Sequence, residues 1–123
     1  AATVEAALVR WYTDPFRADR PDVMDLTRSW VLANDPQIYL HLYSILAEGI
    51  DEIIAPFPPI RCPTLVITGD EDYGNSPLMS AAIAAEIAGA RLITLQGLRH
   101  MALAEKPDAV NEPVAAFLTE VLT

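Results

Sequence analysis

The segment Cys62-Pro-Thr-Leu-Val-Ile-Thr-Gly-Asp-Glu-Asp72 constrains the fold of this 123-residue chain more than any other stretch. Residues 64–68 form a short, almost uninterrupted run of β-branched and aliphatic side chains, which is typical of a parallel strand covered on both faces. Gly69 ends the run, and three carboxylates follow at once at positions 70–72. They are therefore expected at the carboxyl end of a strand, where open α/β sheets place ligands and catalytic groups.

A helix is predicted to follow this strand. Ser76 can cap its first turn, Pro77 suits its first position, and Gly89 is a stop signal after residues 77–88. Residues 91–95 then favour a second strand. The unit has about the thirty residues of a right-handed crossover, so the two strands should be parallel.

The chain leaves the second strand through Gly97-Leu-Arg-His100, at the same edge where Asp72 follows the first strand. One carboxylate and one imidazole are therefore expected together at one rim of the sheet. In a hydrolytic triad the imidazole takes a proton from the nucleophile, and a buried carboxylate fixes its tautomer. Asp70 and Glu71 compete with Asp72 for the role of the acid, although Asp70 is expected to bond the turn.

The rest of the chain favours helices. Three are predicted before the first strand, at residues 3–12, 21–33 and 36–48, and residues 16–20 are expected to connect the first two. The helix from Pro21 to Ala33 would have Val23, Leu26 and Trp30 on its apolar face. Gly49 is expected to close the third, and the prolines at 56, 58, 59 and 63 to form a stiff connector. The predicted division is a helical, cap-like segment at 1–49 and a βαβα part at 50–123, whose last helix starts near Pro113.

The strings CPTLVITGDED, GNSP and ARLITLQGLRH, and a last helix ending in FLTEVL, resemble the C-terminal half of an α/β-hydrolase. Within that superfamily they are most similar to the 3-oxoadipate enol-lactonases and related small esterases. The resemblance covers residues 50–122 and, more loosely, the helices before them. It implies an α/β fold, hydrolysis of carboxylic esters or lactones, and a triad in the order Ser, Asp, His. The family's GxxD and GxxH spacings then imply Asp72 as the triad acid and His100 as the base.

The nucleophile that this family implies is not in the chain. It stands in a G-x-S-x-G turn upstream of the cap, and none of the serines, at positions 29, 44, 76 and 80, is flanked by two glycines. The oxyanion-hole loop and the first strands lie upstream as well. We therefore expect a fragment of an α/β-hydrolase fold that is inactive alone. Its expected partners are the missing N-terminal half and, in the intact protein, a small ester or lactone.

Two other interpretations stay open. Haloperoxidase-like and dehalogenase-like relatives share the fold, and only the absent nucleophile distinguishes them from an esterase. The chain would otherwise be a non-catalytic interaction module that retains the scaffold, with Asp72 and His100 as relics.

Composition argues against several classes of function. The net charge is −9 and the eight basic residues are scattered, so nucleic acid is not an expected partner. Two distant histidines and one cysteine give no metal-binding spacing, and the five separated glycines form no phosphate loop, so no metal or cofactor is expected. Short apolar runs predict no membrane span, and a soluble, cytoplasmic protein is the expectation.

Single residues outside the rim are interpreted as structural. Cys62 is expected to be buried at a strand start, His41 to be packed within its helix, and Glu105 and Asp108 to be ordinary helix-start acids. Aromatic residues of the helical segment are expected in the core more often than in a pocket. The open edge of the strand at 64–68 and the apolar helix at 36–48 predict a homodimer or larger assembly.

Overall fold

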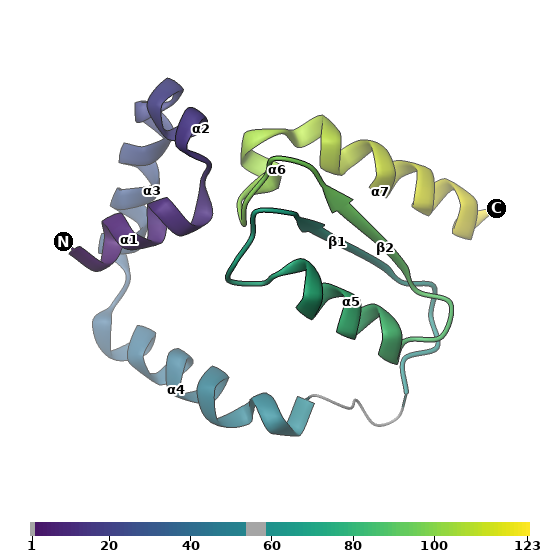
Figure 1. Ribbon diagram of the computed structural model, residues 1–123. Helices are drawn as coiled ribbons and strands as arrows, with labels where there is room; N and C mark the ends of the chain where they lie inside the picture. The colour runs from purple at the N-terminus through teal and green to yellow at the C-terminus, as the bar shows by residue number, and fades with distance from the viewer. Residues whose placement is uncertain (1, 54–58) are drawn as a thin grey trace.

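The computed structural model describes residues 2–53 and 59–123. These two stretches contain nine helices and strands (Figure 1), namely α1 (Ala2–Trp11), α2 (Asp14–Asp19), α3 (Pro21–Ala33), α4 (Pro36–Ile53), β1 (Leu65–Gly69), α5 (Pro77–Glu86), β2 (Arg91–Leu95), α6 (Ala102–Glu105) and α7 (Pro107–Leu122).

The second stretch forms a small α/β unit. Strands β1 and β2 are parallel, with Leu65 opposite Arg91 and Gly69 opposite Leu95. Helix α5 lies on one side of this two-stranded sheet and α7 on the other (Figure 1). The predicted α/β fold class and the parallel crossover are therefore confirmed, as the β-branched runs and the Ser-Pro helix start had indicated.

The start of α5 follows its local sequence. The Ser76 hydroxyl oxygen accepts a hydrogen bond from the Met79 N–H at 3.4 Å, and Pro77 occupies the first helical turn. Gly89, shortly after the helix, adopts φ +77°, a conformation that residues with a Cβ rarely tolerate. These local signals explain why the helix and the second strand lie where the sequence predicts them.

Helices α1, α2 and α3 pack around a small core of their own. Its buried side chains are Leu8, Tyr12 and Met24. The Tyr12 ring stacks on Phe16 with ring centres 5.6 Å apart, and its hydroxyl forms a 3.1 Å hydrogen bond with Thr27 Oγ1. This core fixes the end of α1, which lies beside the rim of the sheet (Figure 1).

Three helix boundaries differ from the prediction. Most of residues 16–20 belong to α2, because Pro15 suits a first helical turn. Helix α4 continues past Gly49 to Ile53, since a single glycine costs a helix only about 1 kcal/mol. The predicted boundary between residues 49 and 50 lies within the range of α4, and two of the four connector prolines, Pro56 and Pro58, lie outside the described residues. Helix α7 begins at Pro107, and Pro113 lies within it.

Burial in the helical segment also differs from the prediction. Leu26 and Trp30 of α3 are exposed, whereas Met24 and Thr27 are buried, because adjacent positions around the helix make the contact with α1. Cys62 is exposed, since it precedes the first residue of β1 by three positions. His41 is exposed on α4 and is not packed.

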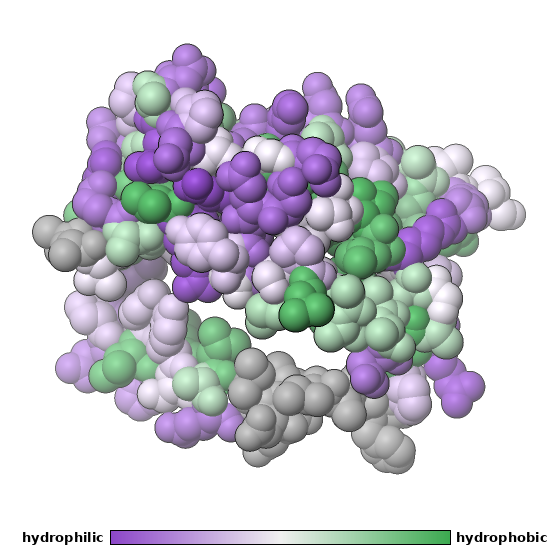
Figure 2. Space-filling view, viewed as in Figure 1, coloured by the Kyte–Doolittle hydropathy of each residue, from purple (hydrophilic) through white to green (hydrophobic). Residues whose placement is uncertain are grey.

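Helix α4 exposes apolar side chains on most of its surface. Figure 2 shows hydrophobic residues on the part of α4 that faces the viewer. The exposed large apolar residues of this helix are Ile38, Tyr39, Leu40, Leu42, Tyr43, Ile45 and Leu46. Contiguous apolar surface of this kind usually marks a contact site.

Candidate active site

Two loops meet at the carboxyl edge of the sheet. The Asp70 N–H donates to Leu95 O at 2.9 Å, and the Glu71 N–H donates to Leu98 O at 3.1 Å. The Asp70 carboxylate accepts hydrogen bonds from the Gly97 N–H at 2.7 Å and the Leu98 N–H at 3.4 Å. Asp70 therefore bonds a turn, as its type predicts, but the turn is the one after β2. Its carboxylate joins the loop that follows β1 to the loop that precedes His100.

The two loops approach closely because a glycine ends β1. A Cβ added at Gly69 would overlap the carbonyl oxygen of Leu98. Gly97 adopts φ +66°, in the left-handed region that favours glycine. These two glycines let the second loop turn back over the end of β1, which brings His100 next to Asp72.

Asp72 lies at the centre of this rim and is 5% exposed. One carboxylate oxygen, Oδ1, accepts hydrogen bonds from the N–H groups of Gly74 at 2.9 Å and Asn75 at 2.8 Å. The other, Oδ2, lies 2.9 Å from Nδ1 of His100. The structure thus brings together the two residues that the sequence predicts as an acid–base pair.

The surroundings of Asp72 favour its ionised form. Burial raises the pKa of this carboxyl, but the hydrogen bonds from the Asn75 N–H, from His100 and from the Gly74 N–H outweigh burial. The pKa of Asp72 therefore lies below its ordinary value of 3.8.

The ionised carboxylate determines the tautomer of His100. A carboxylate can only accept hydrogen bonds, so Nδ1 of the imidazole carries the hydrogen and donates a hydrogen bond to Asp72 Oδ2. Nε2 of the neutral ring is then free to accept a proton. The His100 side chain is 42% exposed at the rim. An imidazole oriented in this way can act as a general base.

A hollow of about 250 Å³ lies beside the pair. Its lining includes Asp72 and His100 together with the buried hydroxyls of Thr68 and Ser80. A larger cleft of about 590 Å³ lies beside α2, and neither member of the pair lines it. Of these two hollows, the smaller one is lined by the His100 imidazole.

The contacts of three residues near the rim, Thr13, Arg99 and Glu105, were not predicted from the sequence. Arg99 precedes His100 and is bonded to the end of α1, and Glu105 accepts hydrogen bonds from the Thr13 N–H at 2.8 Å and hydroxyl at 2.6 Å. Glu105 is therefore not an ordinary helix-start acid. These contacts join positions 87 or more apart in sequence, so no local sequence pattern predicts them.

The other predicted positions lie away from the pair. Asp108 is exposed in the first turn of α7, in keeping with a helix-start acid, and Glu71 is exposed, with Oε2 3.6 Å from Nε of Arg99. Among residues 2–53 and 59–123 no group of three or more potential ligands is placed to hold a metal ion. No helix in these two stretches is both long and apolar enough to cross a membrane.

No family model matches the chain. The chain is 24% identical over 119 residues to an (E)-2-((N-methylformamido)methylene)succinate hydrolase from Acinetobacter baylyi. This match covers 94% of the chain and 43% of that protein. It is also 34% identical over 68 residues to a small part, 3%, of the polyketide synthase ThaQ from Burkholderia thailandensis; this match covers 55% of the chain.

The crystal structure of the enol-lactonase from Burkholderia xenovorans LB400 matches 96% of the chain and 44% of that protein, with a TM-score of 0.82 and 32% identity. The chain thus spans less than half the length of this enzyme and of the Acinetobacter hydrolase. The βαβ unit, the paired loops at its rim and these similarities together identify the fold of the chain as that of an α/β-hydrolase, similar to the enol-lactonase over most of the chain.

Proposed function

We propose that the chain supplies the acid and the base of a hydrolase of carboxylic esters or lactones. The single observation that supports this most directly is the 2.9 Å contact between Asp72 Oδ2 and Nδ1 of His100, whose side chain is 42% exposed at the rim. In this role Nε2 takes the proton of a nucleophilic hydroxyl while its oxygen attacks the carbonyl carbon of the substrate. The same imidazole, as imidazolium, then gives the proton to the departing oxygen, and Asp72 stabilises the positive ring.

The proposal assigns the nucleophile and the oxyanion hole to a polypeptide segment outside this chain. None of its four serines lies between the two glycines of a G-x-S-x-G turn. An oriented imidazole has nothing to deprotonate without a positioned hydroxyl, and the developing oxyanion needs its own donors. We therefore expect the 123-residue chain to be inactive alone and active together with that segment.

Covalent labelling tests this division of the site. A fluorophosphonate probe reacts with an activated serine, so the isolated chain is expected to label no more than its heat-denatured control. The chain joined to the segment that bears the nucleophile is expected to label on that segment, and His100→Ala is expected to abolish the reaction. Labelling of the isolated chain above the denatured control would contradict the proposal.

The residue at the nucleophile position separates the ester or lactone hydrolases from other relatives. A serine there supports the proposal, whereas an aspartate would support a dehalogenase-like reaction of the same fold. Failure of the joined protein to turn over any ester would favour a non-catalytic module that retains the scaffold.

The exposed apolar surface of α4 supports a second part of the proposal, which concerns partners. Apolar surface of this extent is normally covered in a stable protein. Within residues 2–53 and 59–123, β1 pairs with β2 alone, which leaves its other edge open to further pairing. We assign these surfaces to the segment that bears the nucleophile, and to a second copy when the chain is alone.

A further inference from the structure

The C-terminal end of α1 is bonded to the residues on both sides of His100. Carbonyl oxygens in the last turn of a helix lack partners within the helix. Here the Val9 and Tyr12 oxygens accept hydrogen bonds from Nη1 of Arg99 at 2.8 and 2.9 Å, and the Trp11 oxygen accepts one from the Met101 N–H at 2.9 Å. The loop that bears His100 therefore caps α1.

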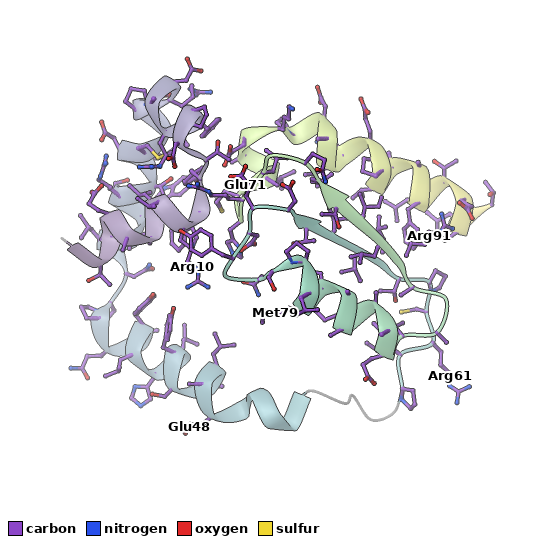
Figure 3. All side chains as sticks on the ribbon, viewed as in Figure 1. Arg10, Glu48, Arg61, Glu71, Met79 and Arg91 are labelled. Atoms are coloured by element: carbon purple, nitrogen blue, oxygen red, sulfur yellow. The ribbon has the colours of Figure 1, made fainter. Side chains whose placement is uncertain are left out.

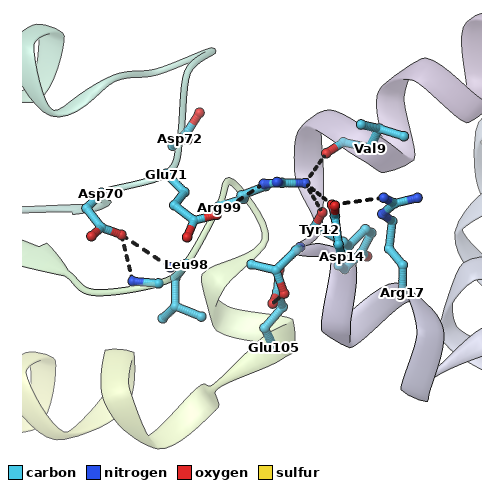
Figure 4. Close-up of polar contacts among 12 residues, drawn as sticks. Val9, Tyr12, Asp14, Arg17, Asp70, Glu71, Asp72, Leu98, Arg99 and Glu105 are labelled. Atoms are coloured by element: carbon cyan, nitrogen blue, oxygen red, sulfur yellow. Dashed lines mark hydrogen bonds and ion pairs between the residues drawn. The ribbon is translucent and has the colours of Figure 1, made fainter.

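Arg99 joins three parts of the molecule (Figure 4). Besides the two carbonyl oxygens, its Nη1 contacts Oδ1 of Asp14, at the start of α2, at 2.8 Å. Its Nε lies 3.6 Å from Oε2 of Glu71, in the loop after β1. The side chain is only 17% exposed, so the guanidinium is largely withdrawn from water. The acceptors Val9 O, Tyr12 O and Asp14 Oδ1 all surround the single nitrogen Nη1, which belongs to a permanently charged group.

From these contacts we propose that Arg99 is a positioning residue for His100. The imidazole is 42% exposed and one hydrogen bond to Asp72 orients it, so packing alone does not fix its place. Arg99 and Met101 hold the main chain on either side of His100 against α1, which keeps Nδ1 in line with the Asp72 carboxylate. The inference rests on the proposed function only where it treats His100 as the base.

One consequence is that the position of the helical segment controls the geometry of the rim. The α1 carbonyl oxygens are fixed by the core around Leu8 and Tyr12, and Arg99 transmits their position to the neighbouring imidazole. A displacement of about 1 Å in a catalytic group can lower a rate by about 10²-fold. Loss of the Arg99 contacts should therefore disturb the pair without removing either of its members.

The hydrogen bond between His100 and Asp72 is the direct readout. In a chain labelled with ¹⁵N-histidine, the Nδ1–H of His100 should give a downfield proton signal that is protected from exchange, while exposed His41 provides an internal reference. We expect Arg99→Met to remove this signal and leave the His41 signals unchanged. Arg91→Met is the matched control, because Arg91 pairs with Glu120 and lies far along the sheet from Glu71 (Figure 3).

The conservative variant keeps the test decisive if Arg99→Met does not fold. Arg99→Lys retains the charge and the aliphatic stem, but its Nζ lies one bond closer to the backbone than Nη1 of arginine, so it should fold and show a weakened, faster-exchanging His100 signal. A folded Arg99→Met or Arg99→Lys chain, judged by far-ultraviolet circular dichroism, with a His100 signal as strong and protected as the parent's would overturn the proposal.

Turnover gives a second readout in the protein that includes the nucleophile. Arg99→Met is expected to lower kcat by about 10²-fold with little change in KM, because the base is displaced while the substrate contacts remain. Equal kcat values for this variant and the parent would contradict the inference. The spectroscopic test needs no activity, so its failure and the failure of the proposed function are distinguishable.

Discussion

The buried Asp72 carboxylate accepts three hydrogen bonds, and its pKa lies below the ordinary 3.8. A carboxyl with a lowered pKa in the folded state contributes stability that is present above the unfolded value and is lost as the pH falls through the folded value. Asp72→Asn should therefore flatten the acid limb of the stability curve below about pH 4. Urea unfolding at a series of pH values measures this slope.

Asp25→Asn is the control for that measurement, because Asp25 forms only an exposed ion pair with Arg28. It should leave the acid limb close to that of the parent. Equal slopes for Asp72→Asn and the parent would mean that the hydrogen bonds to Asp72 do not stabilise its charge.

Two glycines provide a matched pair of substitutions. A Cβ at Gly69 would overlap the backbone oxygen of Leu98, whereas a Cβ at Gly49 meets nothing within 4 Å. Gly69→Ala should lower the free energy of unfolding by about 1–3 kcal/mol. Gly49→Ala should raise it by about 0.5–1 kcal/mol, since Gly49 lies within α4. Chemical denaturation measures both, and a neutral Gly69→Ala would contradict the account of the close loops.

The sequence predicted the contact between residues that the sheet brings together. Asp72 and His100 meet because parallel strands bring their following loops to one edge, and strand order follows from the pattern. The sequence did not predict the contacts of Arg99, Thr13 and Glu105, because these contacts form where the helical segment packs on the rim. His41 was expected to be packed and is exposed, since an apolar neighbourhood in sequence does not determine which elements cover it.

The junction between α1 and α2 is joined to the end of α6 by one carboxylate. Glu105 accepts both the N–H and the hydroxyl of buried Thr13. Glu105→Ala leaves these two donors without their acceptor and should lower the free energy of unfolding by about 1–3 kcal/mol. Glu120→Ala, which breaks an exposed ion pair with Arg91, should cost less than about 1 kcal/mol. Similar losses in the two variants would contradict the structural role of Glu105.

Among the elements, the strands and α5 were predictable because their signals are local. A β-branched run, a Ser-Pro start and the glycine at 89 act within a few residues. Helix ends elsewhere were less predictable, because proline and glycine signals compete with continued helix formation. Gly49 lies within α4 and Pro113 lies within α7, so neither residue marks a helix end.

For the whole molecule, the proposal predicts that the isolated chain associates. The apolar side chains of α4 face outward, and burial of about 25 cal/mol per Å² of such surface favours contact. Light scattering at micromolar concentration should show a dimer or larger species, and Leu42→Glu should shift it towards the 13.4 kDa monomer. Glu48→Gln is a neutral control on the same helix. A monomeric parent that unfolds cooperatively would contradict this prediction.

Turnover of a p-nitrophenyl ester by the chain joined to the segment that bears the nucleophile is the decisive measurement for the acid–base pair. We expect activity in the joined protein, none in the isolated chain, and losses of about 10⁴-fold or more in kcat for His100→Ala and Asp72→Asn. His41→Ala, which changes the other, exposed histidine, should retain parental activity. Undiminished turnover in His100→Ala would contradict the claim that Asp72 and His100 are the acid and base of this hydrolase.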